Sequence, residues 1–256
     1  MNPNAPFPDQ TALVTGASRG IGRAIAEQLA RRGCRVALHY RAHAKAAEAV
    51  VNGLHGQGHR AFQADLGDPH AVRRLWEEVT GSMGPIRVLI NNAGIYELHP
   101  PLQTGAEAWY EVWRRTLDIN LLAPASLCHL AGAAMAAAGG GRVVNISSRG
   151  AFRGEPEAPA YAASKAGLNA LSQSLALALA REGVYLFAIA PGWVATDMAN
   201  GHLAGQAGPA ILAQHPLGRV ASPQEVAAAA VFCALDAPPA MTGCIIDVNG
   251  ASYLRH

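Results

Sequence analysis

The sequence predicts a single α/β domain in which helices cover both faces of a doubly wound, parallel, seven-stranded sheet. Short β-branched or apolar runs alternate with longer Ala-rich segments of helical period. This alternation continues without a Gly/Ser linker or an internal repeat. The chain has 256 residues, of which 50% are hydrophobic and 15% are charged, so it can bury one sizeable core. We therefore expect residues 1–256 to fold as one domain.

The expected strands are the short apolar runs, and the expected helices are the segments whose apolar residues recur every three or four positions. The strands are predicted, in chain order, at residues 12–15, 35–40, 60–64, 86–90, 142–146, 184–190 and 244–248. The helices are predicted between them, at residues 20–32, 43–56, 69–82, 107–138, 161–182 and 223–235. Residues 193–214 break the alternation, are rich in small residues and follow a strand end, which predicts a substrate lid at about residues 193–215.

Composition argues against several kinds of partner. Lysine and arginine number 20 against 18 acidic residues, and no basic block occurs, so nothing indicates nucleic-acid binding. Residues 1–8 lack the features of a signal peptide, and polar residues interrupt the apolar stretches 121–138 and 168–180. We therefore expect a cytoplasmic protein without a membrane span. Free thiols and no metal site are expected from the scattered cysteines Cys34, Cys128, Cys233 and Cys244.

A glycine-rich turn follows the first predicted strand and opens the first helix. Gly16 permits a tight turn, Gly20 lets a pyrophosphate approach the helix N-terminus, and Gly22 lets that helix pack against the strand. A plain strand-to-helix loop is the alternative interpretation. The position of the turn in the first βαβ unit favours dinucleotide binding.

The end of the second strand indicates which dinucleotide is bound. A carboxylate that would hold a ribose 2′-hydroxyl is absent there, and Arg41, together with Arg19, could pair with a 2′-phosphate. NADP(H) is therefore favoured over NAD(H), unless both arginines are merely solvated. Asp65, just after the third strand, could accept a hydrogen bond from an adenine amine or could cap the helix that starts at Pro69.

Acid/base chemistry is indicated at the start of the helix after the fifth strand. A spacing of four puts Tyr161 and Lys165 on one helical face, in a chain whose only other lysine is Lys45. A nearby ammonium stabilises a phenolate, so Lys165 could tune Tyr161 for proton transfer, although an inert surface pair is the alternative. Ser148, or its neighbour Ser147, could hold a substrate oxygen just past the fifth strand. Asn120 lies inside a predicted helix, where asparagine is mildly unfavourable, which suggests that its side chain has a functional role.

These motifs resemble the short-chain dehydrogenases/reductases over residues 11–250, a family with a Rossmann-type fold. The resemblance rests on the glycine-rich turn, the run Asn91-Asn92-Ala93-Gly94, Asn120, Ser148, the Tyr161/Lys165 pair and Pro191-Gly192 followed by Thr196. The usual thirteen-residue step from serine to tyrosine selects Ser148 over Ser147. The cofactor set implied by the resemblance is Gly16, Ser18, Arg19, Gly20, Ile21, Gly22, Tyr40, Arg41, Asp65, Leu66, Asn92, Ala93, Gly94, Tyr161, Lys165, Pro191, Gly192, Val194 and Thr196.

The resemblance also implies the reaction. Tyr161 would be the general acid that protonates a ketone as it is reduced to a secondary alcohol, and Ser148 would bind the carbonyl oxygen. Lys165 would hold the nicotinamide ribose and lower the pKa of Tyr161, while Asn120 would support a water of a proton relay. The pattern is most similar to 3-oxoacyl-carrier-protein reductases. Enoyl-type reductases space their tyrosine and lysine farther apart.

Two departures from the carrier-protein reductases concern their docking surface and core. Those enzymes generally have basic residues near the site entrance, where this chain has residues 139–141, all glycine, and Glu182. Docking of a carrier protein is therefore doubtful. Phe187 stands where an asparagine is common, and the sequence gives no reason for it.

The predicted substrate pocket comprises Tyr96, Arg149, Arg153, Trp193 and Met198. Its two arginines could attract an acidic substrate, but we favour their pairing with Glu155 and Glu157.

Two alternative functions remain open. One is a sugar or secondary-alcohol dehydrogenase acting oxidatively, and the other is a non-catalytic nucleotide-sensing protein. The resemblance also implies a homotetramer or homodimer, built on the two long helices and the last strand.

Overall fold

The computed structural model describes residues 10–196, 199, 201, 203–206 and 208–255. It confirms the predicted parallel sheet, whose strand order is β3-β2-β1-β4-β5-β6-β7. All six pairs of neighbouring strands in the sheet are parallel. The strands are β1 Thr11–Val14, β2 Arg35–Tyr40, β3 Arg60–Gln63, β4 Ile86–Asn91, β5 Gly141–Ile146, β6 Val184–Pro191 and β7 Ile245–Val248.

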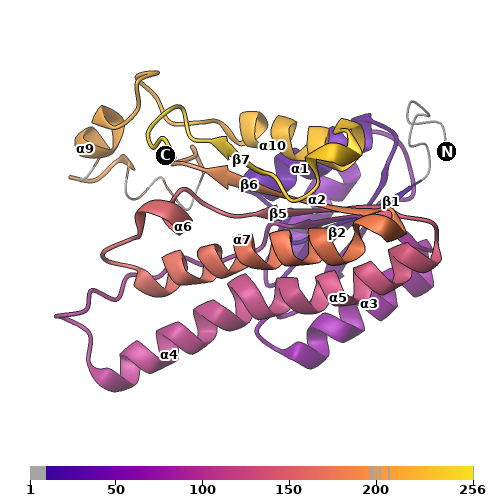
Figure 1. Cartoon of the computed structure of the whole chain (residues 1–256), viewed down its shortest axis with the longest axis horizontal. Coiled ribbons are helices and arrows are strands. Elements are labelled where there is room, and N and C mark those ends of the chain that lie inside the picture. Colours follow the sequence, from indigo (N-terminus) through magenta and orange to yellow (C-terminus); the bar gives the residue numbers. More distant parts are fainter. Residues whose placement is uncertain (1–9, 197–198, 200, 202, 207, 256) are drawn as a thin grey trace.

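Helices cover the sheet on both faces, as Figure 1 shows. On one face, α1, α2 and α10 bury Ile25, Val50 and Val226 against the sheet. On the other face, α3, α5 and α7 bury Leu75, Leu127 and Ala176. The described helices are α1 Gly20–Arg31, α2 Ala44–Gly53, α3 Pro69–Met83, α4 Ala106–Leu117, α5 Ala123–Ala137, α6 Gly150–Arg153, α7 Pro159–Leu179, α9 Gly208–Ala213 and α10 Pro223–Val231.

The order of the strands fixes where a ligand can bind. Strand β1 pairs with β2 on one side and with β4 on the other, so the chain reverses its winding direction between β3 and β4. Loops that leave the carboxyl ends of β1 and β4 therefore diverge, and a crevice opens between them.

Three predicted helices and the predicted lid differ from the observed elements. The helix expected at 107–138 is interrupted by a π-helical turn at Asp118–Leu122, and the helix expected at 223–235 ends in a second π turn at Phe232–Asp236. The helix expected at 161–182 begins at Pro159 and finishes in a 3₁₀ turn. Helix α9 lies within the stretch expected to be irregular. Each π turn continues directly from an α-helix, so the helical periodicity of the flanking residues did not reveal it.

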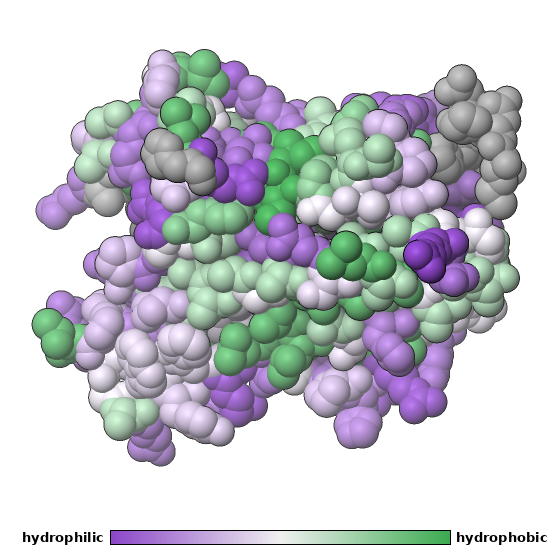
Figure 2. Space-filling model, viewed as in Figure 1, coloured by the Kyte–Doolittle hydropathy of each residue, from purple (hydrophilic) through white to green (hydrophobic). Residues whose placement is uncertain are grey.

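The long helical stretch Ala106–Ala137 is apolar and long enough to cross a membrane, and half of its most apolar window is buried inside the protein. Burial of this kind is typical of a core helix. Apolar side chains nevertheless remain on the outward face of this layer, where Leu122 is 54% exposed and Leu177 is 87% exposed. Figure 2 shows green, apolar residues spread over this helical layer.

Phe187, which the sequence left unexplained, is a core residue of β6. Its ring is fully buried in the cluster formed by α1 and α10. The Arg142 guanidinium lies 5.9 Å from the ring centroid and also donates a hydrogen bond to the Cys233 carbonyl at 2.9 Å. An aromatic ring at this position thus stabilises a half-buried cation.

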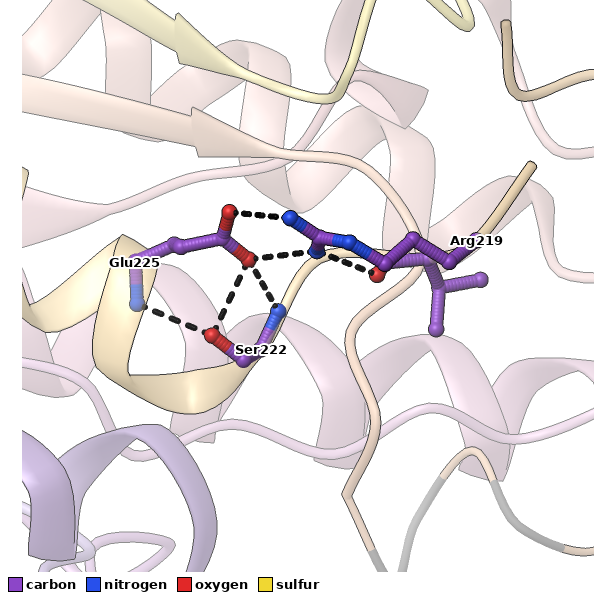
Figure 3. A network of polar contacts seen from close by, with 4 residues as sticks. Arg219, Ser222 and Glu225 are labelled. Carbon is purple, nitrogen blue, oxygen red and sulfur yellow. Dashed lines mark hydrogen bonds and ion pairs between the residues drawn. The ribbon is translucent and has the colours of Figure 1, made fainter. Parts of the chain in front are cut away.

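The start of the segment expected to form the lid pairs with residues that follow the segment. Val194 and Ala221 form a parallel bridge, and the Ala195 amide donates to the Ala221 carbonyl at 2.9 Å. Ser222 then caps α10 in a capping box with Glu225. Arg219 donates two hydrogen bonds of 2.8 Å to the same carboxylate (Figure 3). Hydrogen bonds from Arg219 and from the Ser222 backbone lower the pKa of Glu225 to about 2.

Replacing the N-cap residue Ser222 should destabilise the start of α10, where the segment expected to form the lid rejoins the domain. Ser222→Ala removes the acceptor for the Glu225 amide, which should reduce the free energy of unfolding by about 1 kcal/mol. For a chain of this size we expect the Tm to fall by about 2–4 °C in a thermal scan. The control is Ser174→Ala, in an exposed helix interior where alanine is the better helix former. Equal Tm values for Ser222→Ala and the wild type would contradict the role of the cap.

Candidate functional site

A cleft of about 360 Å³ opens at the carboxyl ends of the strands. It is lined by residues at the ends of β1 to β6 and in the loops that follow them. The predicted residues that line it are Gly16, Ser18, Arg19, Gly20, Ile21, Tyr40, Arg41, Asp65, Leu66, Asn92, Ala93, Gly94, Tyr96, Ser148, Arg149, Tyr161, Lys165, Pro191, Gly192, Trp193, Val194 and Thr196.

Four predicted residues are not among the lining residues. Gly22 lies beneath the glycine-rich turn, Asn120 lies behind the cleft, and Arg153 lies beside Arg149. Met198 lies outside the described residues. Sequence reasoning did not assign a site role to several lining residues, which are His39, Ala42, His43, Ile95, Ile119, Ile146, Glu155 and Ala199.

The glycine-rich turn is held by the loop after β4. Gly16 has φ +62°, and a side-chain carbon there would lie only 2.9 Å from the Ala93 Cα. The Asn92 side chain donates to the carbonyls of Thr15 at 2.9 Å and Gly16 at 3.0 Å. A side chain at Gly22 would collide with both Asn92 and the Gly16 carbonyl. Asn92 therefore fixes the turn as well as lining the cleft.

His39 ties the turn to two neighbouring strands. Its Nδ1 accepts a hydrogen bond from the Gly16 amide at 3.1 Å, and its Nε2 lies 3.1 Å from the Ala64 carbonyl. The Gly16 N–H needs an acceptor and the Ala64 carbonyl needs a donor, so the imidazole is neutral and carries its hydrogen on Nε2. Burial lowers the pKa of His39 from 6.5 to about 4. No pattern in the sequence distinguishes this histidine from an ordinary strand residue.

Positive side chains line one end of the cleft. Arg19 precedes α1 and Arg41 follows β2. Within the described part of the chain, neither guanidinium has an ion-pair partner. Asp65 also lines this end, and its Oδ1 accepts from the Gly67 amide at 2.9 Å. The alternative that Asp65 caps the next helix is wrong, because Asp68 caps α3 through the His70 amide at 2.8 Å.

Tyr161 and Ser148 meet at the other end, near the carboxyl end of β5. Both side chains line the cleft, Ser148 partly offsets the raised pKa of Tyr161, and the Ser148 Oγ accepts a hydrogen bond from the Gly150 amide at 3.0 Å. The Tyr96 ring packs edge-on against Tyr161 with 4.9 Å between centroids. Two hydroxyl groups thus face the cleft side by side, where they can hold one substrate oxygen.

Lys165 is anchored beside this pair. Its ammonium donates to the Ile146 carbonyl at 2.7 Å and lies 5.8 Å from the centroid of the Tyr161 ring. Burial lowers the pKa of Lys165 to about 8. Burial also raises the pKa of Tyr161 to about 12, and the bond to Ser148 offsets this only in part. Desolvation of the phenolate therefore dominates in the chain alone, and the expected lowering of the Tyr161 pKa by Lys165 stays a prediction.

Asn120 acts through its neighbours. It lies in the π turn, and its side chain exchanges two 2.9 Å hydrogen bonds with the backbone of Ile95. Its Nδ2 also donates to the Ser164 Oγ at 3.2 Å. Because these bonds occupy its amide group, Asn120 positions the loop after β4 and the helix turn next to Lys165. The predicted support of a relay water by Asn120 stays a prediction.

The expected pairing of the pocket arginines is only partly observed. The Arg153 Nε lies 3.8 Å from the Glu155 carboxylate. Arg149 instead donates to the Gln214 side chain and to the Ser252 carbonyl. The interpretation that both arginines pair with Glu155 and Glu157 is therefore wrong for Arg149, which approaches two neutral oxygens brought in by the lid and the C-terminal segment.

The sequence of this chain is similar to those of known oxidoreductases. A family model described as "Enoyl-(Acyl carrier protein) reductase" matches residues 16–251. A cis-4-hydroxycyclohexanecarboxylate dehydrogenase of Sinomonas cyclohexanicum is 37% identical, over 95% of this chain and 96% of its own. A 3-oxoacyl-[acyl-carrier-protein] reductase of Staphylococcus aureus is 36% identical, over 96% of this chain and 98% of its own.

A solved structure is similar along the whole chain. It is a protein from Beutenbergia cavernae, described as an NAD(P)-dependent gluconate 5-dehydrogenase, with NADP bound at low occupancy. The TM-score is 0.87 at 36% sequence identity, and the match covers 97% of this chain and 99% of that one.

The neutral His39 bridge predicts a pH dependence of stability. The unfolded chain takes up a proton at this residue near pH 6.5, whereas the folded chain does so only near pH 4. The stability that depends on neutral His39 is therefore complete above about pH 6.5 and is lost as the pH falls toward 4. In chemical denaturation at about pH 7 and about pH 5, the wild type should lose more stability than His39→Asn, which cannot titrate. An NMR titration of the imidazole near 6.5 would contradict the bridge.

Proposed function

The chain belongs to the short-chain dehydrogenase/reductase family, and from this premise we propose that it reduces a ketone to a secondary alcohol with NADPH. Members of this family act on CH–OH and C=O groups, so the chain is an oxidoreductase. The observation that carries the proposal is the hydroxyl pair of Tyr161 and Ser148 at one end of a cleft whose other end is the glycine-rich turn.

The proposed reaction uses the chain's own groups as follows. The substrate oxygen accepts hydrogen bonds from Ser148 and Tyr161, so both hydroxyls meet the charge that develops on it. When bound, the cofactor supplies a hydride to the carbonyl carbon. The Tyr161 O–H bond breaks as the proton moves to the substrate oxygen. A pKa of about 12 keeps that proton on the phenol at neutral pH, as a general acid requires. The nearby Lys165 ammonium stabilises the phenolate left behind.

Two features support NADP(H) as the cofactor. Arg19 and Arg41 lie at the ribose end of the cleft without ion-pair partners in the described chain, where they could bind a 2′-phosphate. The solved structure from Beutenbergia cavernae contains NADP.

The proposed substrate is a 3-oxoacyl thioester or a similar small carbonyl compound. The staphylococcal relative is named as a 3-oxoacyl reductase, but residues 139–141 and Glu182 are not basic, and only the adjacent Arg181 could contribute a positive charge to carrier-protein docking there. The four-residue Tyr161–Lys165 spacing argues against enoyl reduction. Oxidation of a sugar or secondary alcohol is the second candidate, favoured by the two relatives named as dehydrogenases.

We also propose self-association through the apolar outward face of the α5 and α7 layer, where Leu122 and Leu177 are exposed (Figure 2). A homotetramer or homodimer would cover this face.

Removing the phenol should abolish proton transfer without removing the fold. For Tyr161→Phe we expect kcat to fall by about 100- to 10,000-fold, because general acid catalysis contributes that much. NADPH oxidation at 340 nm, followed over a panel of 3-oxoacyl thioesters, diketones and sugars, measures it. Tyr110→Phe, on an exposed helix face, is the control. A Tyr161→Phe rate equal to the wild-type rate across the panel would favour the non-catalytic nucleotide-sensing alternative.

Cofactor selection should depend on Arg41. Arg41→Ala removes a charge-assisted hydrogen bond to the 2′-phosphate, worth about 1.5–3 kcal/mol. The KM for NADPH should therefore rise about 10- to 100-fold while the KM for NADH changes little. Arg60→Ala, which removes the same charge from the exposed start of β3, is the matched control. Parallel rises for both cofactors would rule out recognition of the phosphate by this residue.

A further inference from the structure

Arg149 is a buried cation that forms no ion pair with a described residue, although the charge of the nearby Glu155 acts on it. Only 2% of the residue is exposed, and it directly follows Ser148 in the chain. One terminal nitrogen donates to the Gln214 Oε1 at 3.0 Å and the other donates to the Ser252 carbonyl at 3.3 Å. Both acceptors are neutral, and no carboxylate of the described residues lies within ion-pair distance of it. Burying a charge in this way is costly unless an anion compensates it.

Arg153 places a second cation at the Gln214 side-chain oxygen. It lies at the end of the short helix α6, and its terminal nitrogen donates to the Gln214 Oε1 at 3.1 Å. The nearest acid is Glu155, 3.8 Å from the Arg153 Nε. Two guanidinium groups and one carboxylate leave a net charge of +1 around Gln214. Burial and the charge of Arg153 lower the pKa of Arg149 to about 10, so it is still protonated at neutral pH.

This cluster reaches the substrate end of the cleft through Arg149 and Glu155, whereas Arg153 and Gln214 are not among the lining residues. Arg149 and Glu155 line the cleft together with Tyr96, Trp193 and Ser148. Gln214 comes from the segment just after α9, which the sequence predicted to be the substrate lid. The charge is therefore placed where the part of a substrate remote from its reacting carbon would lie.

We propose that the substrate carries a single carboxylate, and that Arg149 and Arg153 bind it at the position of the Gln214 side-chain oxygen. This inference rests on the proposed reduction of a ketone and takes an oxo acid, in place of a 3-oxoacyl thioester, as the substrate, with the corresponding hydroxy acid as the product. Two guanidinium groups offer a carboxylate several parallel N–H donors, and the amide oxygen between them marks where one carboxylate oxygen would sit. Glu155 disfavours a second negative charge, so a dianion fits less well.

Paired probes separate charge recognition from catalysis. We would measure kcat/KM with NADPH for 3-oxo, 4-oxo and 5-oxo carboxylates and for their methyl esters, which keep the ketone but lose the charge. The wild type should prefer at least one acid over its ester by tenfold or more. Arg149→Met should lower this acid-to-ester ratio at least tenfold, and Arg153→Met should lower it less. Arg31→Met removes the same charge from the exposed end of α1 and should leave the ratio as it is.

A second variant keeps the test sharp if Arg149→Met does not fold. Gln214→Glu puts a permanent carboxylate between the two guanidinium groups, so it should raise the Tm and remove the preference for the acid. A wild type that turns over esters as well as acids would overturn the carboxylate site alone. Equal losses for acid and ester in Arg149→Met, with no change of ratio in Gln214→Glu, would also overturn it. Absence of turnover with every probe would overturn the proposed function and this inference together.

Discussion

The junction between the ends of β1 and β4 is the contact on which the cleft depends. The Thr15 hydroxyl accepts from the amides of Asn92 and Ala93, each at 3.0 Å, while the Asn92 side chain donates to the carbonyls on the other side. These bonds join the end of β1 to the loop after β4, where the winding of the sheet reverses. They fix the position of the glycine-rich turn relative to that loop. Every lining loop takes its position from this junction, since the neighbouring strands are in register with β1 and β4.

Burial, more than pairwise charge, sets the protonation of the chemical groups. Desolvation raises the pKa of Tyr161 and lowers the pKa values of Lys165 and His39, so each group is shifted toward its neutral form. The hydrogen bonds then determine what each group can do. His39 is confined to one tautomer by its two partners, whereas Tyr161 keeps its proton beside Ser148. The same low-dielectric environment therefore produces a rigid bridge at one end of the cleft and a proton donor at the other.

The sequence was most informative where a single local rule decides the structure. Apolar runs located all seven strands, and the four-residue spacing put Tyr161 and Lys165 on one face of α7. Sequence-based prediction failed where contacts between residues far apart in the chain, or the exact path of a turn, determine the partner of a side chain. Asp65 and Asp68 are equally good helix caps by type, and only the turn geometry gives the cap to Asp68. Likewise, Glu155 and Glu157 are near Arg149 in sequence, yet Gln214 and Ser252 reach it from 65 and 103 residues away.

The half-buried Arg142 and the buried Arg149 are surrounded by different groups. Neither has a carboxylate partner among the described residues, and burial lowers the pKa of both. The Arg142 guanidinium lies 5.8 Å from the centroid of the Tyr185 ring and 5.9 Å from that of the Phe187 ring, and the faces of such rings stabilise a cation. Arg149 approaches only two neutral oxygens, one of them on a side chain that can be displaced. A cation needed for the fold alone would gain from the first arrangement, whereas a cation that must accept an anion from the cleft requires the second.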